Sequence, residues 1–135
     1  MSARDLARAL AAGRVAIGAG LLVAPRLSLG LWIGRDAAGG GVSAPGRALG
    51  IREVALGSMA IHVVDDPGVG AGLLRTLALC DGVDLLATLV ARRSLPPAGR
   101  ALVLAMASAG VAGQLLVAAR LDAQRNLTPE AEAET

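Results

Sequence analysis

The sequence predicts an all-α protein, a transmembrane four-helix bundle with short connections. Its mean hydropathy is +0.59, and charged residues make up only 18% of its 135 residues, compared with roughly 25% in ordinary soluble domains. Trp32 stands alone, without any Phe or Tyr, so a water-soluble core would lack the large side chains that contribute most to burial. Abundant Ala and Gly instead suit close helix packing within a membrane.

A single domain is expected, because the chain has the usual length of one domain and contains no linker followed by a second core. Residues 1–125 are predicted to form the four-helix membrane domain. Residues 126–135 are polar and acidic, and they are predicted to form a disordered C-terminal tail. A soluble helical bundle stays open as an alternative, because the second predicted span is unusually polar.

The first predicted span runs from near Leu6 to Ala24, with Arg14 near its middle. It ends at Pro25, which cannot donate the next helical hydrogen bond. Basic residues precede its apolar run as in a signal peptide, but Asp5 and Arg14 interrupt that pattern and no cleavage site follows. We therefore expect a span that is retained.

A short apolar stretch, 26–34, separates the first span from the second. Trp32 within it is typical of the membrane headgroup boundary. The glycines at 39–41 and the Pro45-Gly46 pair indicate the loop that leads into the second span.

The second and third spans are predicted at about Arg47–Val64 and Leu73–Val90. They are joined by a turn at 65–68 that contains Pro and Gly. Both contain charged residues within an otherwise apolar run: Arg52 and Glu53 in the second, Asp81 and Asp84 in the third.

The fourth span, Ala101–Ala119, contains no charged residue and has no polar stripe. A soluble amphipathic helix would have such a stripe, so its absence favours a helix exposed to lipid. Small residues at four-residue spacing predict ridges for close packing, formed by Ala105, Ala109 and Gly113 here and by Ala12, Ala16 and Gly20 in the first span.

Short connections predict that neighbouring helices run antiparallel and that both termini lie on one side. Arginines near the span ends are slightly more frequent in the first and third loops than near the termini. The positive-inside rule therefore favours cytoplasmic first and third loops in a multi-pass protein of the cell inner membrane.

The charged residues inside the spans predict an internal network. Each ionised group near the bilayer centre costs about 2.5 to 3.5 kcal/mol on insertion scales, so several together need compensation. Asp81 and Asp84 are three residues apart and share a helix face. We expect Arg14 and Arg52 to neutralise them together with Glu53, since the guanidinium group can pair with carboxylates in bidentate fashion.

Two interpretations of this network stay open. It can be a structural clasp that sets the register and orientation of the helices. It can also be a functional site, because two neighbouring carboxylates oppose each other's ionisation and could supply a proton donor and acceptor.

Several other classes of site are not indicated. His62 is the single histidine, and Cys80 has no recognised ligand spacing around it, so no metal is expected. No phosphate loop or other cofactor motif occurs. The basic residues, all Arg, are spread along the chain without interleaved aromatics, which argues against a nucleic-acid partner.

Two segments resemble a family of small four-span bacterial membrane proteins of unknown function. Residues 47–57 read Arg-Ala-Leu-Gly-Ile-Arg-Glu-Val-Ala-Leu-Gly, and residues 81–84 read Asp-Gly-Val-Asp. The family motifs they resemble are Arg-x-x-Gly-Ile-Arg-Glu/Asp-x-x-Leu-Gly in one helix and Asp-x-x-Asp in the next. The resemblance extends from about Arg14 to Leu121. It implies that Arg52, Glu53, Asp81 and Asp84 belong together, and it assigns no activity.

The expected role is that of a structural or accessory bundle in the lipid bilayer, packed as a homo-oligomer or against a larger membrane partner. The alternative is a membrane-embedded enzyme or carrier for a lipophilic small molecule. In that case the three carboxylates would be acid/base or proton-relay candidates, and an arginine would stabilise charge.

Overall fold

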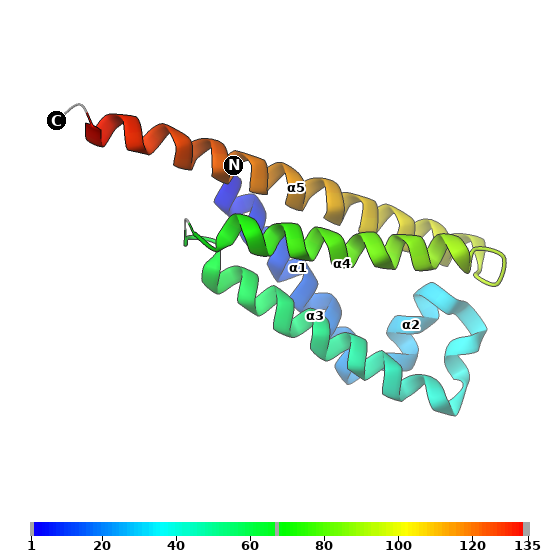
Figure 1. The fold of residues 1–135 in the computed structure, drawn as a ribbon. Coiled ribbons are helices and arrows are strands. Elements are labelled where there is room, and N and C mark those ends of the chain that lie inside the picture. Colours follow the sequence, from blue (N-terminus) through cyan, green and yellow to red (C-terminus); the bar gives the residue numbers. More distant parts are fainter. Residues whose placement is uncertain (1, 67, 134–135) are drawn as a thin grey trace.

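The computed structural model describes residues 2–66 and 68–133, with side chains as far as Asn126. Every regular element in these ranges is helical, which confirms the all-α prediction. There are five α-helices rather than four (Figure 1). They are α1 (Ala3–Val23), α2 (Pro25–Ile33), α3 (Ser43–Val63), α4 (Gly70–Val90) and α5 (Pro97–Ala133), with the short 3-10 helices η1 (Gly34–Ala38) and η2 (Gly40–Val42) before α3.

The four long helices run lengthwise in alternating directions (Figure 1). We call the end that holds both termini and the α3–α4 connection the terminal end. The opposite end, formed by residues 24–47 and 91–100, is the loop end. Helix α1 packs mainly on α3, and α4 packs mainly on α5, while α1 also touches α5. The long helices that follow one another are thus antiparallel, and both termini lie at one end, as the sequence predicts. The prediction of short connections throughout was wrong for residues 24–42, which contain α2, η1 and η2.

Helix α2 is the element that the sequence analysis did not predict. Pro25 is its first residue, a position where the ring is compatible with helical backbone and no donor is lost. It ends at Gly34, which adopts φ +63°, a left-handed conformation that favours glycine. Trp32 is half-buried and packs against a small cluster that includes Leu21 and Leu29. The apolar stretch thus folds back as a separate helix across the loop end.

The interface between α1 and α3 is built from small residues. Gly18 on α1 faces Gly50 on α3, where an added Cβ would lie 2.8 Å from the Gly18 carbonyl oxygen. Two turns further along, a Cβ on Gly57 would lie 2.7 Å from the Ala11 carbonyl oxygen. The two backbones therefore approach so closely that only glycine fits at these positions, as in small-residue interfaces between membrane helices.

The predicted small-residue ridges were wrong about which faces are buried. Ala12 and Ala16 on α1 are exposed, as are Ala105 and Ala109 on α5. The buried faces are instead those that contain the polar side chains Arg14 and Gln114. Helices α1 and α5 are rotated so that these polar groups reach partners inside the bundle. The free-energy cost of leaving such a group unpaired exceeds the small gain from burying an alanine.

Helix α5 extends beyond the predicted end of the domain at residue 125. It continues as far as Ala133, so most of the segment predicted as a disordered tail, 126–135, is helical. The side chains of 127–133 and the last two residues lie outside the described part of the chain.

Within the described residues, two helices are long and apolar enough to cross a membrane, namely α1 and the Pro97–Asn126 part of α5. Length and composition alone define this test, and a soluble core helix or a signal sequence can also meet it. Helices α3 and α4 have the same length as α1. Every 18-residue stretch of these two helices contains three charged residues, which are Arg47, Arg52 and Glu53 in α3 and Arg75, Asp81 and Asp84 in α4, whereas residues 6–23 of α1 contain only Arg8 and Arg14.

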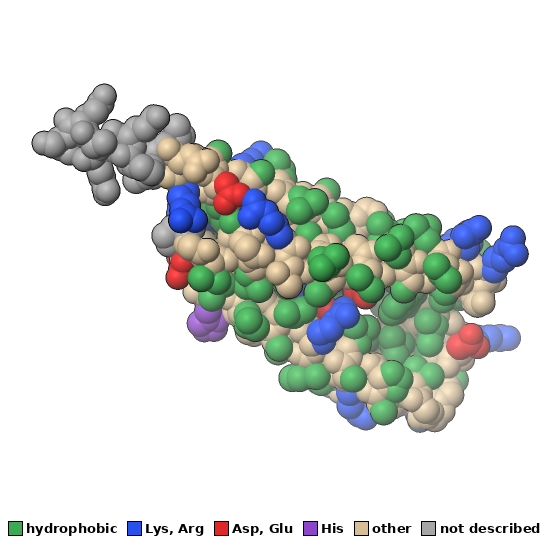
Figure 2. Space-filling model, viewed as in Figure 1, with side chains coloured by type: hydrophobic (Ala, Val, Ile, Leu, Met, Phe, Trp, Pro, Cys, Tyr) green, Lys and Arg blue, Asp and Glu red, His purple; other side chains and the backbone are tan. Residues whose placement is uncertain are grey.

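The outer surface of the bundle is largely apolar. Large hydrophobic side chains are exposed along all the long helices (Figure 2). Leu79, Val83 and Leu86 on α4 are 69%, 55% and 62% exposed, respectively. On the same helix Asp81 is buried, so α4 turns apolar groups outward and a carboxylate inward.

Candidate functional site

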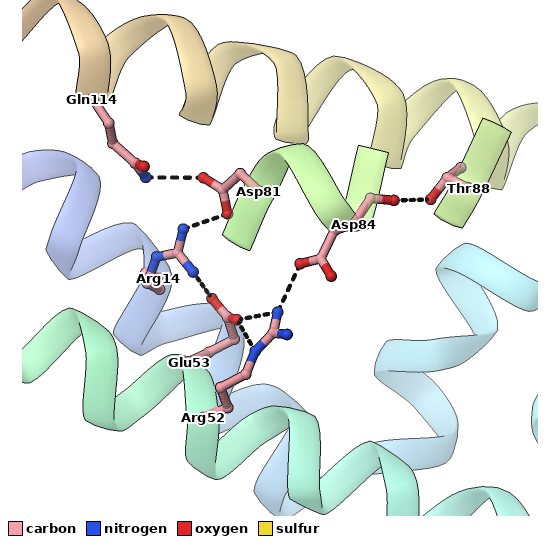
Figure 3. A network of polar contacts seen from close by, with 7 residues as sticks. All are labelled: Arg14, Arg52, Glu53, Asp81, Asp84, Thr88 and Gln114. Atoms are coloured by element: carbon pink, nitrogen blue, oxygen red, sulfur yellow. Dashed lines mark hydrogen bonds and ion pairs between the residues drawn. The ribbon is translucent and has the colours of Figure 1, made fainter. Parts of the chain in front are cut away.

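Five charged side chains meet between the helices near the middle of their lengths (Figure 3). We call this set, Arg14, Arg52, Glu53, Asp81 and Asp84, the charge network. It contains all five residues that the sequence analysis singled out. Arg14 comes from α1, the next two residues come from α3, and the two aspartates come from α4.

Arg14 links three helices through one guanidinium group. Its Nη1 donates to Oε2 of Glu53 at 2.6 Å, and its Nη2 donates to Oδ1 of Asp81. All three residues are buried, with Arg14 7% exposed. The two terminal nitrogens of one planar fork thus serve two carboxylates, an arrangement that the single ammonium of lysine could not reproduce.

Arg52 forms the second half of the charge network. Its Nε and Nη2 donate to Oε1 of Glu53 at 3.1 and 3.0 Å, and Nη2 also donates to Oδ2 of Asp84 at 2.7 Å. The side chains of Arg52 and Asp84 are 38% and 32% exposed. The network is therefore deeply buried at Arg14 and opens toward the surface at Asp84.

Helix α5 contributes an amide to the charge network. Gln114 is buried, and its Nε2 donates to Oδ2 of Asp81 at 2.9 Å. Its Oε1 is buried without a hydrogen-bond partner among the described residues. Gln114 was not among the residues predicted for the network, although a lone amide in a span without charges was a signal that it needs a buried partner.

Thr88 is also buried near the network, one turn beyond Asp84 on α4. Its hydroxyl donates to the Asp84 carbonyl oxygen at 2.8 Å, within the same helix. This satisfies the hydroxyl locally, so Thr88 donates to the helix backbone rather than to a charged side chain of the network.

The charge balance of the network is uneven. Two guanidinium groups face three carboxyl groups, so the fully ionised set has one excess negative charge. Asp81 shares Arg14 with Glu53, while Asp84 has only the half-exposed Arg52. Chemically, such a set can hold helices in register, and it can also accept a proton.

The remaining candidates lie apart from the network. His62 is exposed, and its Nδ1 lies 2.7 Å from the Ser58 carbonyl oxygen. Cys80 is a half-buried free thiol. No group of three or more potential metal ligands occurs among the described residues.

Exposed ion pairs join the helices at the terminal end. Arg4 and Arg8 both pair with Asp65, in the connection between α3 and α4, and Arg75 pairs with Asp122 across α4 and α5. Such exposed pairs contribute little to stability, about 0 to 1 kcal/mol each. They reinforce the helix arrangement without forming a site.

The chain was compared with protein-family models, with curated proteins and with solved structures, and none of the three comparisons found a match.

Proposed function

We propose that the chain is an integral membrane protein, a four-span bundle in which α1, α3, α4 and α5 cross the bilayer. Helices α1, α3 and α4 each have 21 residues, and this corresponds to about 31 Å of helix, close to the hydrocarbon thickness of roughly 30 Å. In the 18-residue apolar stretch of each candidate span, only 28% of α1 and 22% of α5 is buried. A core helix of a soluble protein would be mostly buried.

The proposed role is structural or accessory, with the charge network as a clasp between helices. The observation that carries this proposal is the position of Arg14, whose guanidinium group pairs with carboxylates on both α3 and α4. Helices α3 and α4 have few other contacts with each other. Buried ion pairs of this kind specify which helices pair and in which register.

A membrane partner or a second copy of the chain would pack on the outer faces. The exposed small residues of α1 and α5, Ala12, Ala16, Ala105 and Ala109, would allow a close approach. Crosslinking of the tagged chain in native membranes tests this accessory role. A discrete dimer or heteromer is expected, and recovery of monomer alone at every crosslinker concentration would contradict it.

The second candidate function is a membrane-embedded enzyme or carrier for a lipophilic small molecule. It is favoured by the excess carboxylate and by the exposure of Asp84, whose carboxyl group could exchange a proton at the bundle surface. The resemblance to small four-span bacterial membrane proteins assigns neither role.

Separate substitutions of the two aspartates distinguish the candidates. For a clasp, Asp81→Asn should lower the folded yield in membranes, because buried Arg14 loses a charged partner, while Asp84→Asn should have a smaller effect. Asp36→Asn is the matched control, since Asp36 is exposed and forms no ion pair within the described part of the chain. Normal assembly with loss of a growth phenotype in either variant would favour the enzyme or carrier instead.

A further inference from the structure

A pocket opens at the loop end, in the elbow where α1 passes into α2. It has a volume of about 510 Å³ and is lined by Ala24, Pro25, Arg26, Leu27, Ser43 and Arg47. We call it the elbow pocket. Pro25, directly after the end of α1, lines one side of it, and Ser43 and Arg47 of α3 line the other. The pocket is open to the molecular surface rather than enclosed.

The two arginines of the elbow pocket have no carboxylate partner. Arg26 forms no hydrogen bond or ion pair with other described residues, and Arg47 donates only its Nε, to the Leu22 carbonyl oxygen at 3.2 Å. That bond orients the Arg47 guanidinium while its two terminal nitrogens stay available. The Ser43 hydroxyl and the uncapped N-terminus of α3 add further donors and partial positive charge to the same pocket.

Basic and apolar side chains lie next to each other around the elbow pocket. Among the described residues, the loop end contains six arginines and one aspartate, Asp36, and none of the six is in an ion pair. They are Arg26, Arg35, Arg47, Arg92, Arg93 and Arg100. Directly beside the elbow pocket, Val23 and Leu27 are 84% and 75% exposed. Side chains that can bind phosphate thus lie beside exposed apolar side chains.

We propose that the elbow pocket binds the phosphate group of an anionic phospholipid, whose acyl chains pack over Val23 and Leu27. Guanidinium groups engage phosphate oxygens through charge-assisted, often bidentate hydrogen bonds. Basic pockets between membrane helices bind anionic headgroups in the same way. This assignment rests on the proposed membrane location, and it adds a lipid ligand at a site separate from the charge network.

Native mass spectrometry of the full chain in detergent tests the proposal, with phosphatidylglycerol compared with phosphatidylcholine. The wild type should retain one phosphatidylglycerol in preference to phosphatidylcholine. The Arg26→Gln/Arg47→Gln variant should bind phosphatidylglycerol at least about tenfold more weakly, because the loss of one charge-assisted hydrogen bond lowers the affinity by about tenfold. The Arg92→Gln/Arg93→Gln variant has the same net charge at the same end, and it should retain the lipid.

Equal weakening in both double variants would show that diffuse charge attracts the lipid, and it would overturn the pocket assignment. A wild type that does not discriminate between the two lipids would do the same. Inorganic phosphate is the third probe: if it binds with the same dependence on Arg26 and Arg47 while no phospholipid binds, the lipid assignment is wrong. Alkaline extraction of the wild type from membranes tests the proposed membrane location separately, because its outcome does not depend on which lipid the elbow pocket binds.

Discussion

The carboxylate of Asp81 on α4 lies directly against Gly110 on α5, where an added Cβ would overlap its Oδ2 atom. The same oxygen accepts the hydrogen bond from Gln114, one turn further along α5. A glycine in the charge-free stretch of α5, residues 101–119, therefore provides the space in which a buried carboxylate meets its amide partner.

Gly110→Ala should destabilise the bundle by about 1 to 3 kcal/mol, although alanine is the better helix former. The added methyl group must displace the Asp81 carboxylate from Arg14 and Gln114. Gly82→Ala is the matched control, because it is also helical and an added Cβ there would meet nothing within 4 Å. Unfolding of both variants in detergent, followed by circular dichroism, measures the difference. Equal stability of the two would contradict the packing described for Asp81.

Removal of Arg14 should be among the most damaging single substitutions. Arg14→Met leaves Glu53 and Asp81 buried without their shared cation, and breaking a buried pair in this way costs about 3 to 5 kcal/mol. Arg93→Met removes an exposed arginine that forms no ion pair with any described residue and should change stability by less than about 0.5 kcal/mol.

Neutralisation of the carboxylates should rescue the loss of Arg14. In the triple variant Arg14→Met/Glu53→Gln/Asp81→Asn, no uncompensated charge remains at the centre, so most of the folded yield should return. Purification yield and thermal unfolding in detergent report this directly. A triple variant as unstable as Arg14→Met alone would mean that Arg14 acts through its shape rather than its charge.

The loop end should face the cytoplasm. It contains six arginines, whereas the terminal end contains five: Arg4, Arg8, Arg75, Arg120 and Arg125. The positive-inside rule thus places both termini outside the cytoplasm. A C-terminal alkaline phosphatase fusion should be active and a C-terminal green fluorescent protein fusion dark. The reverse pattern would contradict this orientation.

The long helices could be predicted from the sequence because their signals are local. Apolar runs with Pro and Gly at their ends located α1, α3 and α4 and the start of α5 to within a few residues, but α5 continues 14 residues past the predicted end at Ala119. Charged residues within these apolar runs, and the three-residue spacing of Asp81 and Asp84, predicted the members of the network. Helix α2 was not predicted, because nine residues of apolar sequence are too few for periodicity to distinguish a helix from a loop.

The buried faces of α1 and α5 could not be predicted from their small residues alone. Alanines recur on several faces of α1 and α5, so the stripes 12–16–20 and 105–109–113 looked as suitable as the true interfaces. The buried faces are set by pairing across helices, which involves Arg14 with Asp81 and Gln114 with Asp81. These partners are 67 and 33 residues apart in the chain, and a pattern within one helix contains no information about them.

We propose that hydrocarbon surrounds the long helices, so that apolar side chains face outward and ionised groups pair inside. Alkaline carbonate extraction of membranes from cells that express the full chain tests this proposal. The protein should sediment with the membranes after the wash and enter solution only with detergent. Recovery of folded, monodisperse protein in the aqueous fraction without detergent would contradict it.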